Sequence, residues 1–270
     1  MSASIQASAD SFYFGTSEYR LFGAFHEAQT YAQREHGVVL CYPFGNEYIR
    51  SHRACRHLAL RLAESGFPVL RFDYSGTGDS AGDAEDVDMN DWRRDIGHAV
   101  DELRRRTGVE AVCLAGLRLG GSLAYEAAMG HRDVDSLVLW EPIVNGRDYL
   151  SELSLQHQEL LWRFFDEAWN PSISAAGEYL GFAVGPGLRD QLEAFDLRTL
   201  PIERSFSTLV VESQATPATS QLRDRSIQAG QDVDYELIPS FTVWREDIDK
   251  GLVPNDVIRG ITAWAAEKLS

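Results

Sequence analysis

Residues 111–127, AVCLAGLRLGGSLAYEA, contain the strongest local signal in this chain. The first seven residues, AVCLAGL, form a short apolar run of the kind found in strands buried on both faces of a parallel sheet. Gly116, Gly120 and Gly121 surround the turn that follows, and the remaining residues continue as a helix. The stretch therefore predicts a buried strand, a sharp turn and a helix in immediate succession, with Arg118 at the apex of the turn.

Similar apolar runs lie on both sides of this stretch. HGVVLCYP, FPVLRFDY, DSLVLWEP, STLVVES and VDYELIPS each resemble a buried strand, and amphipathic helical patterns separate several of them. Near the N-terminus, SFYFG and YRLFGAFHEA predict an antiparallel hairpin. Alternating strands and helices are typical of right-handed crossovers. The sequence therefore predicts an α/β fold with a mostly parallel, doubly wound sheet.

Residues 146–200 interrupt this alternation. They contain no good strand pattern but many large apolar side chains, among them Leu150, Leu153 and Trp169. We expect a helical cap, or lid, over the carboxyl ends of the strands, where ligands bind in open α/β sheets. Residues 1–145 and 201–270 would form the core domain that carries this insertion.

The charge of the chain restricts its partners. The chain has 41 acidic and 25 basic residues and a formal net charge of −16, so repulsion would oppose binding to nucleic acid or an anionic membrane. No apolar run reaches the roughly 18 residues of a membrane span, and the first ten residues do not resemble a signal peptide. We expect a cytoplasmic protein that binds a small molecule or an acyl group; a homodimer is left open.

The seven histidines lack metal-ligand spacing, so no metal is expected. No other cofactor is expected either.

Three motifs, together with this order of elements, resemble the α/β-hydrolase fold over nearly the whole chain. YPFGNEYIRSHR, FDYSGTGDSAGD and GLRLGG are similar to segments of serine-aminopeptidase-like hydrolases, which occur beside exosortase systems and in nonribosomal peptide or polyketide clusters. Hydrolases of the exosortase A group also resemble this chain in carrying arginine within GLRLG. The resemblance implies a role in natural product biosynthesis, with an acyl or thioester substrate bound to a carrier protein.

Two of the three catalytic groups of such a hydrolase are missing. In the working fold, a serine occupies the turn, and an acid and a histidine follow later in the chain. Here GLRLG keeps both glycines but has Arg118 at the serine position, and a guanidinium is no acyl-transfer nucleophile because it stays protonated. The last histidine is His157, so the loop after the final strand offers no imidazole base. Ordinary Ser-His-acid hydrolysis is not expected.

Arg118 itself has two possible roles. It could bind a carboxylate, phosphate or oxyanion at the floor of a pocket, beside the first turn of a helix. It could instead form a structural ion pair with Glu141 or Glu212, which end the strands on either side of the expected cap. The sequence leaves both roles open, because a buried arginine needs an anionic partner in either case.

Backbone donors near the turn form a second expected feature. The N–H groups of Phe44 or Gly45, together with that of Leu119, are expected to form an oxyanion pocket. Ser122 also lies between small residues, but it is four positions past the apex and should point along the helix.

Two ionisable side chains lie close to the expected oxyanion pocket. Glu47 could act as a general base if burial raises its pKa, or it could cap a helix or pair with Arg50. His52 could be a relocated acid/base group or a histidine on the surface of a helix.

The leading hypothesis is a hydrolase-like protein that binds or transforms an acyl, thioester or carboxylate intermediate without a covalent acyl-enzyme. Glu47, His52 or Glu141 would then transfer protons in a cyclisation, elimination or decarboxylation. A second hypothesis is a non-catalytic pseudoenzyme that acts as a binding or scaffold protein. A third is a conventional esterase or thioesterase, which conflicts with the missing serine and histidine.

Overall fold

The computed structural model describes residues 9–16, 19–30, 33–165, 177–245, 250 and 252–269. Its main feature is an eight-stranded sheet in the order β1-β2-β4-β3-β5-β6-β9-β10. The strands are β1 (Asp10–Gly15), β2 (Arg20–His26), β3 (His36–Cys41), β4 (Val69–Phe72), β5 (Ala111–Leu117), β6 (Val134–Trp140), β9 (Ser207–Glu212) and β10 (Asp232–Leu237). In this sheet β2 is antiparallel to both of its neighbours, and the pairs from β4 to β10 are parallel. The predicted α/β-hydrolase sheet and its N-terminal hairpin are confirmed.

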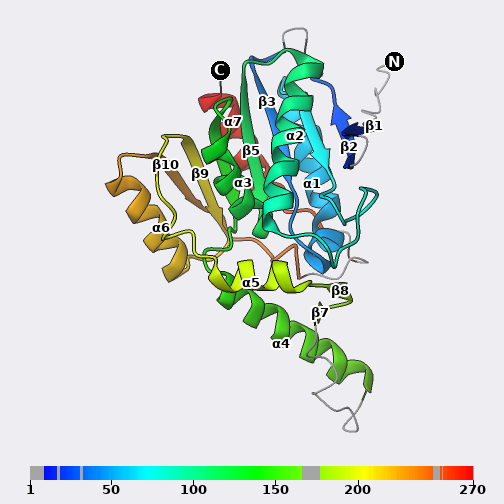
Figure 1. Ribbon diagram of the computed structural model, residues 1–270. Coiled ribbons are helices and arrows are strands. Elements are labelled where there is room, and N and C mark those ends of the chain that lie inside the picture. The colour runs from blue at the N-terminus through cyan, green and yellow to red at the C-terminus, as the bar shows by residue number, and fades with distance from the viewer. Residues whose placement is uncertain are drawn as a thin grey trace.

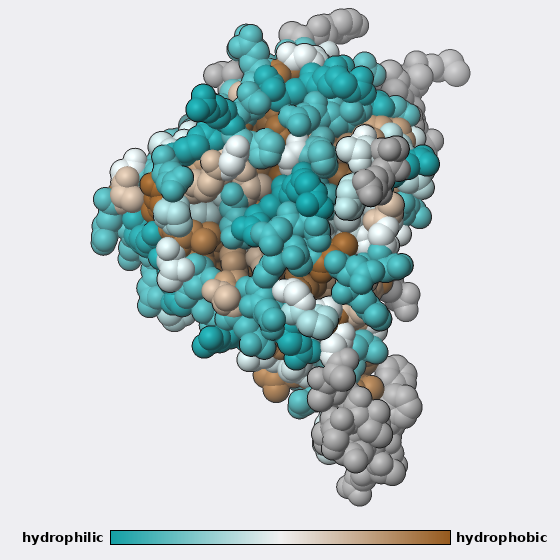
Figure 2. All heavy atoms as spheres, in the orientation of Figure 1, coloured by the Kyte–Doolittle hydropathy of each residue, from teal (hydrophilic) through white to brown (hydrophobic). Residues whose placement is uncertain are grey.

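Helices cover both faces of this sheet (Figure 1), and mostly hydrophilic residues form the surface seen in the same orientation (Figure 2). Helices α2 (Met89–Thr107) and α3 (Leu119–Gly130) pack on one face, and α1 (Asn46–Glu64) and α7 (Asn255–Lys268) pack together on the other. Helix α6 (Pro217–Gln228) lies along β10 at the edge. Helix α2 illustrates the local signals: Asp88 forms a capping box at its start, and Gly108 ends it in the left-handed conformation. In the described part of the chain, no helix has both the length and the apolarity needed to cross a membrane.

Three glycines allow α3 to pack directly against the sheet. A Cβ atom on Gly120 would lie 2.3 Å from the carbonyl oxygens of Cys41 and Tyr42. A Cβ atom on Gly116 would lie 2.4 Å from the backbone of Gly120 and Gly121. Because backbone atoms cannot yield as a flexible side chain can, these positions admit no larger residue without displacing the helix. The glycines therefore fix the helix start, and with it the position of Arg118.

The inserted segment lies across the carboxyl ends of the parallel strands (Figure 1). It contains α4 (Gly146–Phe165), β7 (Glu178–Tyr179), β8 (Phe182–Ala183) and α5 (Pro186–Ala194). Leu150 and Leu153 are buried as expected, whereas residues 166–176, including Trp169, lie outside the described residues. The expectation that the segment contains no strand is wrong, because β7 and β8 pair through a turn at Leu180 and Gly181, both with positive φ. Strands of two residues show no periodicity that a sequence pattern could reveal.

Candidate functional site

Arg118 occupies the strand-to-helix turn that the sequence predicts. It directly follows β5 and precedes α3, with φ 54° and ψ −126°. Positive φ is uncommon for a residue with a side chain, and such strained turns are typical of the nucleophile position in α/β-hydrolases. The backbone N–H of Arg118 donates to the carbonyl of Trp140 at 2.9 Å, which ties the turn to the end of β6.

Two carboxylates neutralise the guanidinium of Arg118. Its Nε donates to Oε1 of Glu47 at 2.9 Å, and its Nη2 donates to Oε2 of Glu152 at 2.6 Å. Burial opposes the charged form of Arg118, but these two carboxylates outweigh it and raise the pKa of the guanidinium. Arg118 is 8 % exposed and Glu47 is 1 % exposed, so this ion pair is largely removed from water. The protein itself therefore supplies the anionic partner that a buried arginine needs.

Aromatic rings enclose the same ion pair. The hydroxyl of Tyr149, on α4, donates to Oε2 of Glu47 at 2.9 Å. The guanidinium carbon of Arg118 lies 5.5 Å from the centre of the Tyr149 ring and 5.0 Å from that of Trp244. Trp244 belongs to the loop after β10, where a working hydrolase has its histidine. Residues 246–249 of this loop lie outside the described residues.

The predicted ion pair of Arg118 with Glu141 or Glu212 is not formed. Oε1 of Glu141 accepts hydrogen bonds from the backbone N–H and the hydroxyl of Ser213, at 2.6 Å and 2.5 Å. Oε2 of Glu212 accepts a hydrogen bond from the hydroxyl of Tyr235 at 2.8 Å. Burial raises the pKa of Glu141, and Glu212 adds to this effect although the two Ser213 hydrogen bonds oppose it. The acids at the strand ends thus have partners of their own, and Arg118 turns toward α1 and α4 instead.

Burial raises the pKa of Glu47, as a general base there would require, although the charge of Arg118 opposes the shift. The other interpretation, a helix cap or a pair with Arg50, is wrong. Glu47 lies in the first turn of α1 but makes no side-chain cap hydrogen bond, and its ion-pair partner is Arg118 rather than Arg50. Glu47 lies two residues after Gly45, the N-cap of α1, which has φ 61° and ψ −128°. This position just after a glycine turn was the feature of the sequence that pointed to Glu47. Glu152 and Tyr149 were missed, because nothing in the local pattern of α4 indicates that this face meets Arg118.

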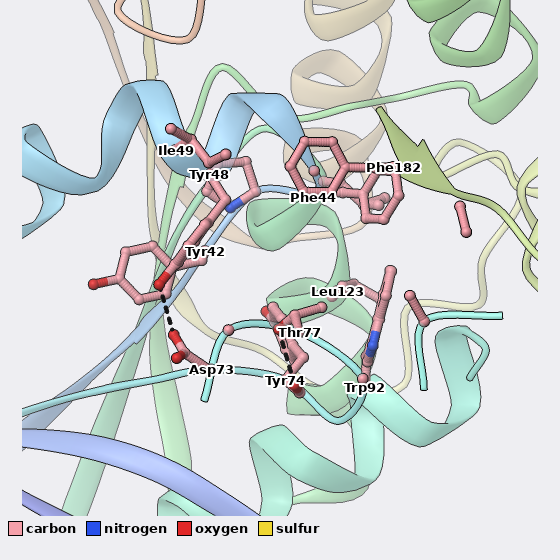
Figure 3. Close-up of a pocket in the computed structure, with 17 residues that line it drawn as sticks. Tyr42, Phe44, Tyr48, Ile49, Asp73, Tyr74, Thr77, Trp92, Leu123 and Phe182 are labelled. Carbon is pink, nitrogen blue, oxygen red and sulfur yellow. Dashed lines mark hydrogen bonds between the residues drawn. The ribbon is translucent and has the colours of Figure 1, made fainter. Parts of the chain in front are cut away.

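An apolar cavity of about 260 Å³ lies beside the elbow (Figure 3). The three predicted oxyanion residues, Phe44, Gly45 and Leu119, all line it. Larger side chains from α1, α2, α3 and β8 form its walls, among them Tyr48, Trp92, Leu123 and Phe182. Within the described residues, the backbone N–H groups of Phe44, Gly45 and Leu119 have no hydrogen-bond acceptor. The three expected oxyanion residues therefore lie round one cavity, and their role as donors stays a prediction.

The polar groups of this cavity lie mainly on the loop after β4. Oδ1 of Asp73 accepts from the hydroxyl of Tyr48 at 2.9 Å, and Oδ2 accepts from the backbone N–H of Asp79 at 3.1 Å. Burial raises the pKa of Asp73, and these two hydrogen bonds oppose the shift. His52 does not line the cavity; it is exposed on α1, where its ring stacks on Tyr42 at a centroid distance of 6.0 Å.

A second cavity, of about 200 Å³, lies on the other side of the elbow. Its lining includes Arg118, Glu141, Glu152 and Glu212, and it shares no lining residue with the apolar cavity. The predicted site residues therefore fall into separate places: the backbone donors in the apolar cavity, and the elbow arginine with the strand-end acids in the acidic one. Neither cavity is lined by a histidine among the described residues. The described residues contain no group of three or more His, Cys, Asp or Glu side chains that could hold a metal ion.

Comparison with known proteins identifies the family of this fold. Residues 33–177 match the family model described as "Serine aminopeptidase, S33". The bovine palmitoyl-protein thioesterase ABHD10, described as mitochondrial, is 33% identical over 84 residues, which cover 30% of this chain and 26% of the relative. Human protein ABHD12B is 32% identical over 121 residues, or 42% of this chain and 32% of the relative. The matched stretches thus span about a third or less of these relatives.

Solved structures extend the similarity to nearly the whole chain. The esterase Pf2001 of Pyrococcus furiosus superposes with a TM-score of 0.69 and 12% identity, covering 97% of this chain and 92% of the esterase. Est1E from Butyrivibrio proteoclasticus, with ferulic acid bound, gives a TM-score of 0.65 and 15% identity, covering 95% and 98%. Mouse ABHD10 gives 0.54 and 18%, covering 94% and 100%. At such low identities these matches establish the fold alone.

Proposed function

Because this chain belongs to the serine aminopeptidase S33 family of the α/β-hydrolase superfamily but has a neutralised arginine at its elbow, we propose that it binds an acyl group without forming an acyl-enzyme. The acyl group would lie in the apolar cavity, with its carbonyl oxygen toward the backbone N–H groups of Phe44, Gly45 and Leu119. The proposed ligand is a thioester or related intermediate of a biosynthetic pathway, presented as a small molecule or on a carrier protein.

The observation that carries this proposal is a set of backbone N–H groups that have no acceptor among the described residues and belong to residues lining an apolar cavity. Buried backbone donors nearly always have an acceptor, so donors without one beside a cavity favour an oxygen atom supplied by a ligand. An apolar cavity of about 150 Å³ can hold benzene. A cavity of about 260 Å³ therefore suits a ring with a short linker or a short acyl chain. The names of two similar proteins, a palmitoyl-protein thioesterase and an esterase with bound ferulic acid, support an acyl or aryl ligand.

Arg118 has a structural role in this proposal. Glu47 and Glu152 already occupy the guanidinium, so a ligand carboxylate would have to displace a protein carboxylate to bind it. We therefore place the acyl group in the apolar cavity rather than on Arg118. The acid/base candidates Glu47 and Glu141 do not line the apolar cavity. Glu47 is hydrogen-bonded to Arg118 and Tyr149, and Glu141 lines the second cavity.

Conventional hydrolysis would need another nucleophile. Ser122 is fully buried on α3, and its hydroxyl donates to the carbonyl of Ile143 at 2.7 Å. A hydroxyl held in this way faces the strand-end backbone rather than a substrate. We therefore favour binding without covalent chemistry, as in a pseudoenzyme that holds or delivers its ligand.

The proposal predicts saturable binding that depends on the cavity mouth. Titration of the protein with hexanoyl- and benzoyl-pantetheine should change its tryptophan fluorescence, because Trp92 lines the cavity. Ala84→Trp would fill the half-buried mouth and should abolish the change, whereas Ala81→Trp, on an exposed residue of the same loop that does not line the cavity, should leave it intact. Equal binding by both variants would contradict the proposed site.

A further inference from the structure

One exposed stripe of α1 starts at the mouth of the apolar cavity. Ile49 lines the cavity and is 42% exposed. His52, Arg53 and Arg56 lie three, four and seven residues further along the helix and are all exposed, so they continue on the same face. The ring of His52 also packs against Tyr42 and Tyr48, two residues of the cavity wall. The stripe and the cavity are therefore contiguous.

Arg53 and Arg56 of this stripe have no partner in the described part of the chain. Neither Arg53 nor Arg56 makes a hydrogen bond or ion pair with a described residue, and no acid lies three or four positions from either. Arg61 on the same helix, in contrast, pairs with Glu64 at 2.6 Å. A chain with 41 acidic and 25 basic residues offers many carboxylates, so adjacent unpaired arginines leave a local excess of positive charge.

A buried arginine lies beneath the stripe and adds to this charge. Arg71, on β4, is 6% exposed and donates to Nε2 of His26 at 2.9 Å and to the hydroxyl of Tyr42 at 2.6 Å. Both partners are uncharged groups, since burial and the nearby Arg71 and Arg56 lower the pKa of His26 to about 4. Asp73, two residues on, is bonded to Tyr48 and Asp79 instead. No carboxylate among the described residues forms an ion pair with Arg71.

The opposite rim of the mouth has the reverse charge. The loop after β4, which lines the cavity through Gly76, Thr77 and Gly78, carries exposed acids at Asp79, Asp83, Glu85 and Asp86. An anionic group leaving the cavity would be repelled from this loop and attracted toward α1. A cavity of about 260 Å³ holds only the acyl end of a thioester, so the remainder of the ligand must cross this rim.

We propose that Arg53 and Arg56, backed by Arg71, bind a phosphate group of the ligand whose acyl end occupies the apolar cavity. This inference rests on the proposed function and narrows it to acyl thioesters with a phosphorylated pantetheine arm. Guanidinium groups suit phosphate because their planar donors match two phosphate oxygens at once. Burial of the acyl end in the cavity would supply one part of the binding free energy. The phosphate would add an electrostatic part, which salt weakens.

Three matched ligands test the phosphate site: hexanoyl-pantetheine, hexanoyl-4′-phosphopantetheine and hexanoyl-CoA. Isothermal titration at low salt should show that the phosphate tightens binding about tenfold, the size expected for two partly exposed charge contacts. Arg53→Gln and Arg56→Gln should each reduce that gain about threefold and leave the affinity for hexanoyl-pantetheine unchanged. Arg132→Gln is the control, because Arg132 is exposed just before β6, at the opposite end of the strands.

The outcomes separate this inference from the proposed function. Binding of hexanoyl-pantetheine without any gain from the phosphate would overturn the anion site and leave the acyl site standing. A gain lost equally in Arg132→Gln would also overturn it, since net charge alone would then explain the effect. Failure of all three ligands to bind would overturn both. Titration with a hexanoyl-carrier protein distinguishes a protein-bound ligand from a free one. If Arg53→Gln weakens binding of the carrier protein more than binding of hexanoyl-CoA, a carrier protein delivers the ligand. If it weakens both equally, the ligand is a free thioester.

Discussion

Nε of Arg118 donates to Oε1 of Glu47 at 2.9 Å, although 71 residues separate the two in the sequence. This contact joins the two sharp turns of the elbow region, because Arg118 is the apex of one and Glu47 follows Gly45, the apex of the other. Each charge would be costly to bury alone, and together they neutralise each other away from water. The position that is a nucleophile in working α/β-hydrolases is here occupied by an arginine in a buried ion pair.

Removing Arg118 should therefore destabilise the protein strongly. Arg118→Met keeps much of the side-chain volume but leaves Glu47 buried without its cation, at an expected cost of about 3–5 kcal/mol in the free energy of unfolding. The double variant Arg118→Met/Glu47→Gln should recover most of this loss, since neither charge remains. Urea denaturation of both variants measures the difference. A double variant as unstable as the single one would show that packing, rather than the buried charge, sets the cost.

The close approach of α3 to the sheet makes a second prediction. Gly120→Ala would place a methyl group 2.3 Å from two backbone oxygens, so it should lower the melting temperature sharply or prevent folding. Gly130→Ala, at the other end of the same helix, meets no atom within 4 Å and should change stability by about 1 kcal/mol or less. Thermal unfolding of the pair compares the two sites directly. Similar melting temperatures for both variants would mean that α3 can shift away from the sheet.

A third prediction concerns stability in mild acid. Burial lowers the pKa of His26 from 6.5 to about 4, with Arg71 and Arg56 adding to the shift, so the unfolded chain binds a proton at this residue before the folded chain does. Stability linked to His26 is complete above pH 6.5 and is lost as the pH falls toward 4. At about 1.4 kcal/mol per pKa unit, the loss is of order 3 kcal/mol.

His26→Gln isolates this contribution, because glutamine keeps an acceptor for Arg71 but does not titrate. The unfolding free energy of the wild-type protein should therefore fall more steeply between pH 6.5 and 4.5 than that of the variant. Parallel slopes for the two proteins would contradict the assigned protonation of His26.

The sequence predicted the parts of this structure that depend on local pattern. Apolar runs and amphipathic stripes located the strands and helices, and the glycines around Arg118 located the elbow, because these features reflect packing of neighbouring residues. Phe44 and Gly45, three and four residues after the end of β3, line one cavity with Leu119, and their role as oxyanion donors stays a prediction.

The partners of Arg118 were not predictable in the same way. Glu152 and Tyr149 lie on a helix of the inserted segment, and their contacts with the elbow depend on how that segment crosses the strand ends. Glu141 and Glu212 were the expected partners because they end neighbouring strands, but Ser213 and Tyr235 bind their carboxylates instead. Trp244 carried no signal beyond its place in the loop after the last strand. Competition among several acids for one arginine is decided by tertiary geometry.

The proposed site binds an acyl thioester and forms no covalent intermediate with it, and a single measurement tests this most directly. Intact-protein mass spectrometry, performed after incubation with saturating hexanoyl-pantetheine, measures covalent transfer, and the same sample shows whether the thioester survives. We predict an unchanged protein mass and an intact thioester at a ligand concentration that saturates the fluorescence change. A mass increase of one hexanoyl group, mapped to a serine of this chain, would contradict the account.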